Sequence, residues 1–256
     1  MRKIKVTLLT ILIWLAIQIL GAIPMAIGSS VNSMGVLDRT LDETMLLAIG
    51  LLATQIIEIF LFWGIRYYNI KDTVRPFPEW KVLLLSLPLG FAVLYGIDLL
   101  ATPLDLPNLL EEDFDGLCRN AIGIVSVAIC GPIAEEIIMR RIILRNLEEA
   151  TGSTWAGILI SAAIFALIHA NPVQIVFAFP AGVLLGWIYC RTGSLLVPIC
   201  IHILNNSFSV ITTRMGVTET PEGTLAWIEL AICIAVAVPL IIWMNRHFKR
   251  TENVAG

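Results

Sequence analysis

The sequence predicts an all-α protein, a polytopic integral membrane protein with eight transmembrane helices. Apolar residues make up 57% of the 256-residue chain and charged residues only 14%, and the mean hydropathy is +0.85. A soluble domain carries roughly 25% charged and 45–50% apolar residues. The apolar residues also gather in runs close to the ~20 residues that a helix needs to cross a ~30 Å hydrocarbon core. We therefore expect a single membrane domain over residues 1–256.

Eight runs are long and apolar enough to be predicted as membrane-spanning helices. They are 5–28, 43–65, 82–101, 121–146, 154–170, 173–190, 194–212 and 225–245. The first run is too long for the apolar part of an ordinary signal peptide, so we expect it to be retained. The fifth to seventh runs are short, and tight turns at Asn171-Pro172 and at residues 191–194 are expected to join them. The loop Asp105–Asn120 is expected to hold a short amphipathic segment.

The basic residues alternate between loops in a way that predicts the orientation. By the positive-inside rule, the side that collects most Lys and Arg is cytoplasmic, so both termini of this multi-pass cell-membrane protein are expected in the cytoplasm. Fourteen of the 17 basic residues fall on that side: Arg2, Lys3, Lys5, Arg66, Lys71, Arg75, Lys81, Arg140, Arg141, Arg145, Arg191, Arg246, Lys249 and Arg250. The opposite side holds Arg39, Arg119 and Arg214 and many acids: Asp38, Asp42, Glu43, Asp105, Glu111, Glu112, Asp113 and Asp115.

Two adjacent glutamates, Glu135 and Glu136, interrupt the fourth apolar run. A single charged side chain at the centre of a bilayer costs roughly 2.5–3.5 kcal/mol on insertion scales. Two neighbouring carboxylates cost more, because like charges at close range resist joint ionisation. A sequence tolerates such a pair only where partners compensate the charge or where chemistry requires it.

Helical spacing predicts different roles for the two glutamates. Arg140 lies one turn after Glu136 and shares its helix face, so it can neutralise that carboxylate. Glu135 points about 100° away and has no local cation, so we expect it to face the interior of the bundle. We therefore expect a structural Glu136–Arg140 ion pair and a reactive Glu135.

Two histidines within predicted spans supply the remaining polar groups of this site. His169 follows Phe165 by four residues and His202 precedes Asn206 by four, so each pair shares a helix face. A histidine near Glu135 can share or shuttle its proton. A neighbouring His–Asn pair can donate hydrogen bonds to a developing oxyanion. Together these residues predict a site that activates water for hydrolysis.

The other polar residues of the spans are expected to be structural. Asn205 is predicted to form an interhelical hydrogen bond, and Glu229 to lie near a membrane interface. Glu58 and Asp98 are expected either to form helix contacts or to lie close to an interface. His247 belongs to a basic, solvated tail. The five cysteines lack C-x-x-C spacing, so we expect small apolar fillers and neither disulfides nor a zinc site among them.

The membrane depths estimated for Glu135 and His169 from the predicted helix ends disagree with each other. If the fourth helix ends near residue 146, Glu135 lies in the inner half of the membrane. At 1.5 Å per residue, His169 lies about 22 Å from Thr154 and therefore in the outer half. Either the fifth helix is tilted, or it begins deeper on the cytoplasmic side, or the active site does not contain both residues.

Three motifs occur in order along the chain: Glu135-Glu136-x-x-x-Arg140, Phe165-x-x-x-His169 and His202-x-x-x-Asn206. On these motifs, residues 120–210 resemble the CPBP family of CAAX-type prenyl endopeptidases and bacteriocin-processing proteins, also called the Abi family. The resemblance implies an eight-helix membrane bundle and a glutamate-dependent intramembrane protease with its catalytic core motifs in this segment. It also implies that Glu135 is the catalytic glutamate, assisted by His169, with His202 and Asn206 as oxyanion donors.

The sequence therefore predicts an intramembrane endopeptidase that cleaves a hydrophobic or lipidated peptide or a membrane-associated protein. Its expected partners are that substrate and the lipid bilayer, and no nucleic-acid signature is present. One alternative is a non-catalytic bacteriocin-immunity or sequestering protein on the same scaffold. Another is a proton-coupled transporter that uses the carboxylates as a relay.

We expect no cofactor and no metal. The chain has no H-E-x-x-H zinc motif, and Arg140 already supplies positive charge beside Glu136. Zinc remains the alternative, with Glu135, His169, His202 and Glu136 as possible ligands.

Overall fold

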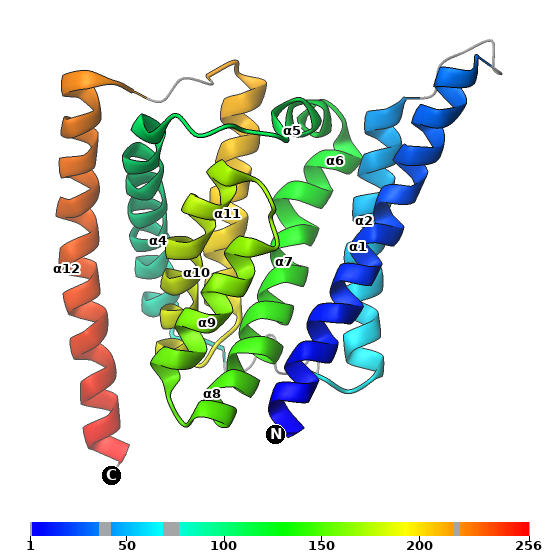
Figure 1. The fold of residues 1–256 in the computed structure, drawn as a ribbon. Helices are drawn as coiled ribbons and strands as arrows, with labels where there is room; N and C mark the ends of the chain where they lie inside the picture. The colour runs from blue at the N-terminus through cyan, green and yellow to red at the C-terminus, as the bar shows by residue number, and fades with distance from the viewer. Residues whose placement is uncertain (1, 36–41, 69–76, 218–220, 256) are drawn as a thin grey trace.

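The computed structural model describes residues 2–35, 42–68, 77–217 and 221–255, with side chains up to residue 248. These residues form helices and no strand, which confirms the predicted all-α class (Figure 1). The helices are α1 (Arg2–Met34), α2 (Glu43–Gly64), α4 (Trp80–Ala101), η1 (Thr102–Leu104), α5 (Glu111–Cys118), α6 (Ala121–Val125), η2 (Ser126–Cys130), α7 (Gly131–Glu136), η3 (Ile137–Leu144), α8 (Arg145–Thr151), α9 (Thr154–Leu167), α10 (Pro172–Thr192), α11 (Leu196–Arg214) and α12 (Gly223–Ala255).

Seven helical segments of the described residues are long and apolar enough to cross a membrane. The predicted eighth span, 154–170, is the 14-residue helix α9, which at 1.5 Å per residue is about 21 Å long and too short to cross alone. Residues 168–171, which follow α9, are non-helical and continue the chain to the start of α10. Asn171 at the end of this non-helical stretch is held by two hydrogen bonds: its side chain accepts from Leu109 N (3.1 Å) and donates to Asn108 Oδ1 (2.9 Å). The protein is a multi-pass membrane protein. The predicted number of eight spans is close to the seven long apolar helices that the described residues contain.

The helices form two outer pairs around a central group (Figure 1). Helices α1 and α2 pack as an antiparallel pair on one side, and α4 packs against α12 on the other. The continuous segment from α6 to α8 runs through the middle, beside α9, α10 and α11. The first turn of α1 and the last turn of α12 lie at the same end of the bundle.

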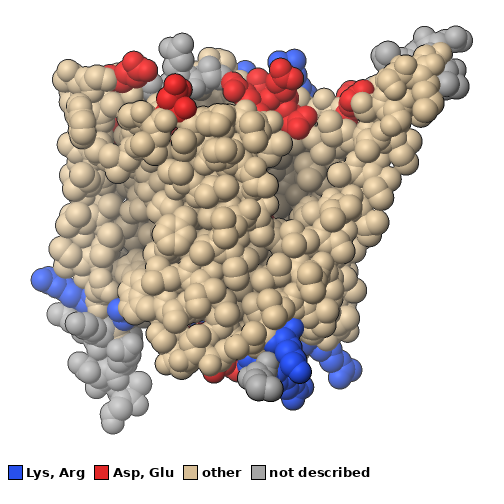
Figure 2. Space-filling view, in the orientation of Figure 1, with Lys and Arg blue, Asp and Glu red and all other residues tan. Residues whose placement is uncertain are grey.

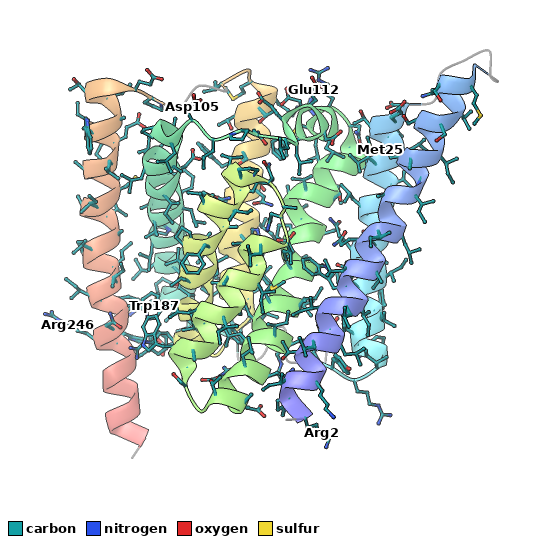
Figure 3. The ribbon with its side chains drawn as sticks, viewed as in Figure 1. Arg2, Met25, Asp105, Glu112, Trp187 and Arg246 are labelled. Carbon is teal, nitrogen blue, oxygen red and sulfur yellow. The ribbon has the colours of Figure 1, made fainter. Side chains whose placement is uncertain are left out.

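Charge divides between the two ends of the molecule. Figure 2 shows acidic side chains gathered at one end and most of the visible basic side chains at the other, with apolar surface between them. Asp105 and Glu112 lie at the first end, and Arg2 and Arg246 lie at the second (Figure 3). A membrane-spanning molecule is expected to have such a distribution, because only its ends meet water.

The loop charges need one correction. Arg140 was counted with the cytoplasmic loop, but the fourth helical segment continues to Thr151, and Arg140 is fully buried inside the bundle. It is therefore no loop charge and says nothing about orientation. Arg39, Asp38, Lys71 and Arg75 lie outside the described residues, as do the side chains of Lys249 and Arg250.

Local sequence signals explain several helix boundaries. The side chains of Asn120 and Ser153 accept hydrogen bonds from the backbone N–H three residues on, at 2.6 and 3.3 Å, and so begin α6 and α9. Gly152 and Gly193 have φ values of 69° and 64°, which end α8 and α10 with a left-handed residue that glycine adopts without strain. The amphipathic segment expected in the loop Asp105–Asn120 is α5, Glu111–Cys118.

The fourth helical segment has two π-helical stretches that the sequence did not predict. η2 and η3 flank α7, which carries the glutamate pair. Pro132 in the first turn of α7 has no N–H to donate, so it cannot form the regular α-helical hydrogen bond to the preceding turn. The wider turn of η2 directly before it accommodates this break. π-Helical turns occur frequently at functional sites.

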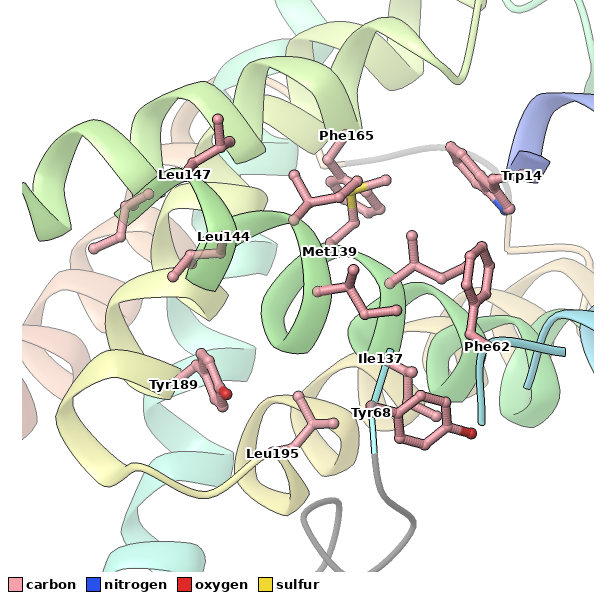
Figure 4. Packing of buried hydrophobic residues seen from close by; sticks show 14 of the residues in the cluster. Trp14, Phe62, Tyr68, Ile137, Met139, Leu144, Leu147, Phe165, Tyr189 and Leu195 are labelled. Carbon is pink, nitrogen blue, oxygen red and sulfur yellow. The ribbon is translucent and has the colours of Figure 1, made fainter. Parts of the chain in front are cut away.

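The largest core cluster surrounds the η3 part of this segment (Figure 4), where side chains from seven helical elements meet: α1, α2, η3, α8, α9, α10 and α11. Met139 and Leu144 are fully buried at its centre, with Phe62 of α2 and Phe165 of α9 beside them. A Cβ at Gly182 of α10 would lie 3.0 Å from Ala162 of α9 and 3.4 Å from Phe165. This absence of a side chain therefore lets α9 pack tightly and brings Phe165 into the core.

Helices α1 and α2 meet at a contact between two glycines. A Cβ at Gly50 would overlap the backbone oxygen of Gly21, and a Cβ at Gly21 would overlap the side chain of Thr54. In a bilayer, where lipid is as apolar as the helices, such close backbone contact is a main source of helix association.

We predict that Gly50→Ala destabilises the protein, because the added methyl group meets backbone and neither helix can yield locally. Overpacking of this kind typically costs about 1–3 kcal/mol. The melting temperature in detergent should fall accordingly. Gly64→Ala in the same helix is the matched control, since nothing lies within 4 Å of a Cβ there. Equal melting temperatures for the two variants would contradict the proposed close contact.

Candidate active site

The three sequence motifs converge on the ring of Phe165. The guanidinium carbon of Arg140 lies 5.1 Å from the centre of this ring, and the rings of His169 and His202 lie 4.9 and 6.1 Å from it, edge to face. Phe165 is itself buried. Helices α9 and α11 therefore bring their motif residues to η3 and to the glutamate pair at the end of α7.

Glu136 is engaged through both of its carboxylate oxygens. Oε2 lies 3.0 Å from Nε of Arg140, and Oε1 lies 3.0 Å from Nδ1 of His202. The side chains of Glu136 and Arg140 are 0% exposed. The expected contact between Glu136 and Arg140 is therefore present, and Glu136 also orients a histidine on another helix, which the sequence did not predict.

Arg140 depends on Glu136 for compensation of its charge. The Nε–Oε2 contact has the distance of an ion pair but is not aligned as a hydrogen bond, and both terminal nitrogens lack an acceptor within the part of the chain that the structure describes. The face of Phe165 provides a further favourable contact for the cation. A buried charge is tolerated only when paired, so the two side chains constrain each other.

Glu135 has a different environment from its neighbour. Its side chain is 28% exposed, and its Oε2 lies 3.7 Å from Nε2 of His202. That distance is too long for a hydrogen bond, and no cation of Arg or Lys lies within ion-pair distance of Glu135 among the described residues. Glu135 is therefore the accessible carboxylate of the pair, on the side predicted from helical spacing.

The two histidines are held in defined states. His169 Nδ1 lies 2.7 Å from the backbone oxygen of Phe165. A carbonyl oxygen only accepts, so Nδ1 carries the proton and Nε2 of the neutral ring is an acceptor. His202 Nδ1 likewise donates to Glu136 and turns Nε2 toward Glu135. With a neutral His169 ring, the site offers one histidine with a free acceptor at Nε2 and one histidine anchored by a carboxylate.

The side chain of Asn206 is hydrogen-bonded to the η2 part of the fourth helical segment. Its Nδ2 donates to the backbone oxygen of Val127 in η2 at 3.0 Å, and its Oδ1 accepts from Asn205 Nδ2 at 3.4 Å. An amide nitrogen has two donor hydrogens, so one remains for another acceptor. Asn205, expected to bond between helices, instead contacts its neighbour and helps to orient it.

The structure also explains the conflicting depths. The fourth segment continues to Thr151, so Glu135 lies 16 residues, or about 24 Å, from its end, which is farther than the predicted end near residue 146 implied. At this depth it is level with His169 near the end of α9. The turn before α11 is itself inside the bundle, because Ser194 and Leu195 are fully buried. His202 therefore reaches the same depth although it lies only two turns into α11.

No three His, Cys, Asp or Glu side chains are grouped to hold a metal ion within the described ranges. The contacts of Glu136 also argue against zinc at this site. Both oxygens of Glu136 already contact Arg140 and His202, and a cation there would compete with the guanidinium. The expectation of a metal-free site remains a prediction.

Comparison with known proteins identifies the region that holds this site. Residues 118–208, which include all three motifs, match the family model described as Type II CAAX prenyl endopeptidase Rce1-like. This match confirms the resemblance to CAAX prenyl endopeptidases that the motifs indicate. The matched region is about a third of the chain.

Two curated relatives are similar over part of their length. The "Putative membrane peptidase YdiL" of Bacillus subtilis (strain 168) is 41% identical over 109 residues, covering 43% of this chain and 44% of that protein. The "Membrane-embedded CAAX protease MroQ" of Staphylococcus aureus (strain USA300) is 39% identical over 95 residues, covering 35% and 38%. The similarity thus extends over less than half of either relative. No solved structure gives a significant match.

We predict that Arg140→Ala lowers the folded yield, because it leaves Glu136 buried and unpaired, at a cost of about 3–5 kcal/mol. A double-mutant cycle with Glu136→Gln checks the cause. Arg140→Ala should lower the free energy of unfolding less in the Glu136→Gln background, with a coupling energy of about 1 kcal/mol or more between the two residues. Thermal unfolding in detergent measures both. The control is Arg246→Ala, an exposed arginine at the end of the bundle. Strictly additive effects of the two substitutions would show that the pair is not coupled.

Proposed function

We propose that this protein is an intramembrane endopeptidase in which Glu135, with His169, activates a water molecule for attack on a peptide bond. The observation that carries the proposal is the asymmetry of the glutamate pair. Glu136 is engaged by Arg140 and His202, whereas Glu135 is accessible and faces a histidine. A carboxylate placed in this way can accept a proton from water.

The chemistry follows from the side chains around Glu135. The water oxygen forms a bond to the carbonyl carbon while Glu135 takes the water proton, and the neutral Nε2 of His169 provides a second acceptor that can hold and pass on a proton. The carbonyl oxygen becomes an oxyanion, for which His202 Nε2–H and the remaining Asn206 Nδ2–H are the proposed donors. Collapse of this intermediate breaks the C–N bond, and the stored proton moves to the leaving amine.

The role of His202 specifies its protonation. Nδ1 donates to Glu136, so Nε2 can donate to an oxyanion only when the ring is an imidazolium. In that form the charges of Arg140, Glu136, His202 and Glu135 sum to zero. We infer that Arg140 contributes to catalysis indirectly, by holding the carboxylate that orients His202.

The substrate we propose is a hydrophobic or lipidated peptide segment that reaches the site within the membrane. Two observations support it. The site lies inside an apolar bundle, and the matching family model is described as a CAAX prenyl endopeptidase while one relative is named a CAAX protease. We also propose that the basic end of the bundle is cytoplasmic, from the positive-inside rule. Both termini would then lie in the cytoplasm.

We predict that Glu135→Gln lowers the turnover number by roughly 10²–10⁴-fold, the usual contribution of a general base, and leaves the melting temperature nearly unchanged. Glu136→Gln should lower both, because it releases Arg140 and His202. Purified variants assayed on a prenylated and an unprenylated peptide measure the rates. Near-normal turnover by Glu135→Gln would refute the assignment. A protein that only binds or sequesters its partner would keep that binding in this variant.

We predict that activity survives exhaustive chelation and that elemental analysis finds no stoichiometric metal. The reason is that Arg140 already provides the positive charge beside Glu136. The measurement is the peptidase rate before and after dialysis against a chelator, with re-addition of zinc as the control. One zinc per chain, with activity lost on its removal and restored by re-addition, would overturn the metal-free mechanism.

A further inference from the structure

The turn between α9 and α10 contains a buried amide side chain that has no part in the mechanism above. Asn171 directly precedes Pro172, the first residue of α10, and is 0% exposed. An asparagine at this position normally accepts a hydrogen bond from the N–H of the second or third helical residue. The side chain of Asn171 makes no such bond to α10. Helix capping by its side chain therefore does not explain this residue.

The side chain of Asn171 binds instead to the loop before α5. Its Oδ1 accepts from Leu109 N at 3.1 Å and its Nδ2 donates to Asn108 Oδ1 at 2.9 Å, across 62 and 63 residues of the chain. Asn108 Oδ1 also accepts from Leu110 N at 3.4 Å, which orders the loop at this point. We call the two long-range hydrogen bonds of Asn171 the Asn171 clamp.

His169 lies two residues before the clamp, and its own hydrogen bonds are local. Its backbone N–H donates to Ala166 O at 3.2 Å, and its Nδ1 lies 2.7 Å from Phe165 O. Its Nε2 forms no hydrogen bond or ion pair with the part of the chain that the structure describes. These bonds fix the imidazole ring relative to the end of α9, but they do not fix it relative to Glu135 on α7.

The chain between His169 and Asn171 has a conformation that needs an outside restraint. Ala170 has a φ of 50°, in the left-handed region that residues other than Gly, Asn and Asp rarely adopt. Its side chain is exposed, so core packing does not hold it there. Pro172 restricts only the residue before it to extended backbone. The Asn171 clamp supplies the restraint that holds the whole turn in one place.

We propose that Asn171 is a positioning residue for His169. By joining the turn after α9 to the loop before α5, the clamp holds Nε2 of His169 where it assists Glu135. This inference rests on the proposed function, in which His169 accepts a proton beside Glu135. A misplacement of about 1 Å can lower the rate by ~100-fold, so the clamp affects the chemical step although Asn171 itself is buried away from the peptide.

The kinetic test uses Asn171→Ala, which removes both bonds of the clamp. The turnover number kcat should fall by about 10- to 100-fold, with KM nearly unchanged. In the His169→Gln background the same substitution should change the residual rate by less than about twofold, because a residue that acts through His169 has no effect once His169 is gone. Equal losses in the two backgrounds would overturn the proposal and leave Asn171 as a purely structural link.

Variants of Asn108 test the clamp from the loop, where the side chain is exposed and a substitution disturbs the fold least. Asn108→Ala removes the acceptor of Asn171 Nδ2 and should lower kcat about threefold to tenfold. Asn108→Asp keeps an acceptor oxygen at this position and should retain a kcat close to that of wild type. Equal rates for the two variants would contradict the clamp.

The matched control is Ser153→Ala at the opposite end of α9. Ser153 Oγ accepts from Ala156 N at 3.3 Å, so this variant loses a helix cap without touching the turn after His169. Its melting temperature should fall, and its kcat should stay near that of wild type. A loss of kcat as large as that of Asn171→Ala would show that the rate follows the stability of α9 in general, against the proposal.

An NMR measurement tests the positioning without an activity assay. The chain has three histidines, so each ring signal of ¹⁵N-histidine-labelled protein can be assigned by replacing one histidine at a time. The His169 signals should shift or broaden in Asn171→Ala and Asn108→Ala, whereas those of His202, which Glu136 anchors, stay in place. Ser153→Ala should change neither.

Unchanged His169 signals in Asn171→Ala, or in Asn108→Ala where the former variant folds poorly, would overturn the inference even if Glu135→Gln is inactive. Shifted His169 signals in a protein whose Glu135→Gln variant keeps full peptidase activity would instead refute the proposed function.

Discussion

The contact of Glu136 with Arg140 and His202 is the constraint on which the rest of the site depends. It places two opposite charges inside an apolar bundle, where neither would be stable alone, and connects α7, η3 and α11 through one carboxylate. The ring of Phe165 packs against the same arginine and both histidines, so α9 joins the arrangement without a charge of its own. Glu135 points away from this contact and is 28% exposed, and its neighbour Glu136 takes up the cation of Arg140.

The local part of this arrangement follows from spacing in the sequence. The intervals between Glu136 and Arg140, Phe165 and His169, and His202 and Asn206 are each one helical turn, and the first two pairs form the contacts that such spacing suggests. The all-α fold and the membrane passes follow from hydropathy alone. These features are predictable because both partners lie on one helix, whose geometry is known in advance.

The contacts between helices could not be predicted in the same way. Glu136 meets His202 across 66 residues, and Asn206 meets the Val127 carbonyl across 79, so neither spacing nor periodicity relates them. Arg140 was counted with the loop residues Arg141 and Arg145, although the helix continues for 11 residues beyond Arg140 to Thr151. The two π-helical stretches around α7 could not be predicted from the sequence either, since Pro132 gives a local reason for only one of them. Packing decides all of these features.

The early end of α9 has a consequence for the solvent inside the membrane. Hydrocarbon cannot satisfy free peptide groups, so a non-helical stretch such as residues 168–171 persists at this depth only where protein or water covers it. Part of this cover is protein, because Asn171 is buried and hydrogen-bonded to Asn108 of the loop before α5. Ala170, next to His169, is exposed, so water is the cover that its peptide groups require. In the proposed hydrolysis, which consumes one water molecule per bond cleaved, this stretch would be where water reaches the site.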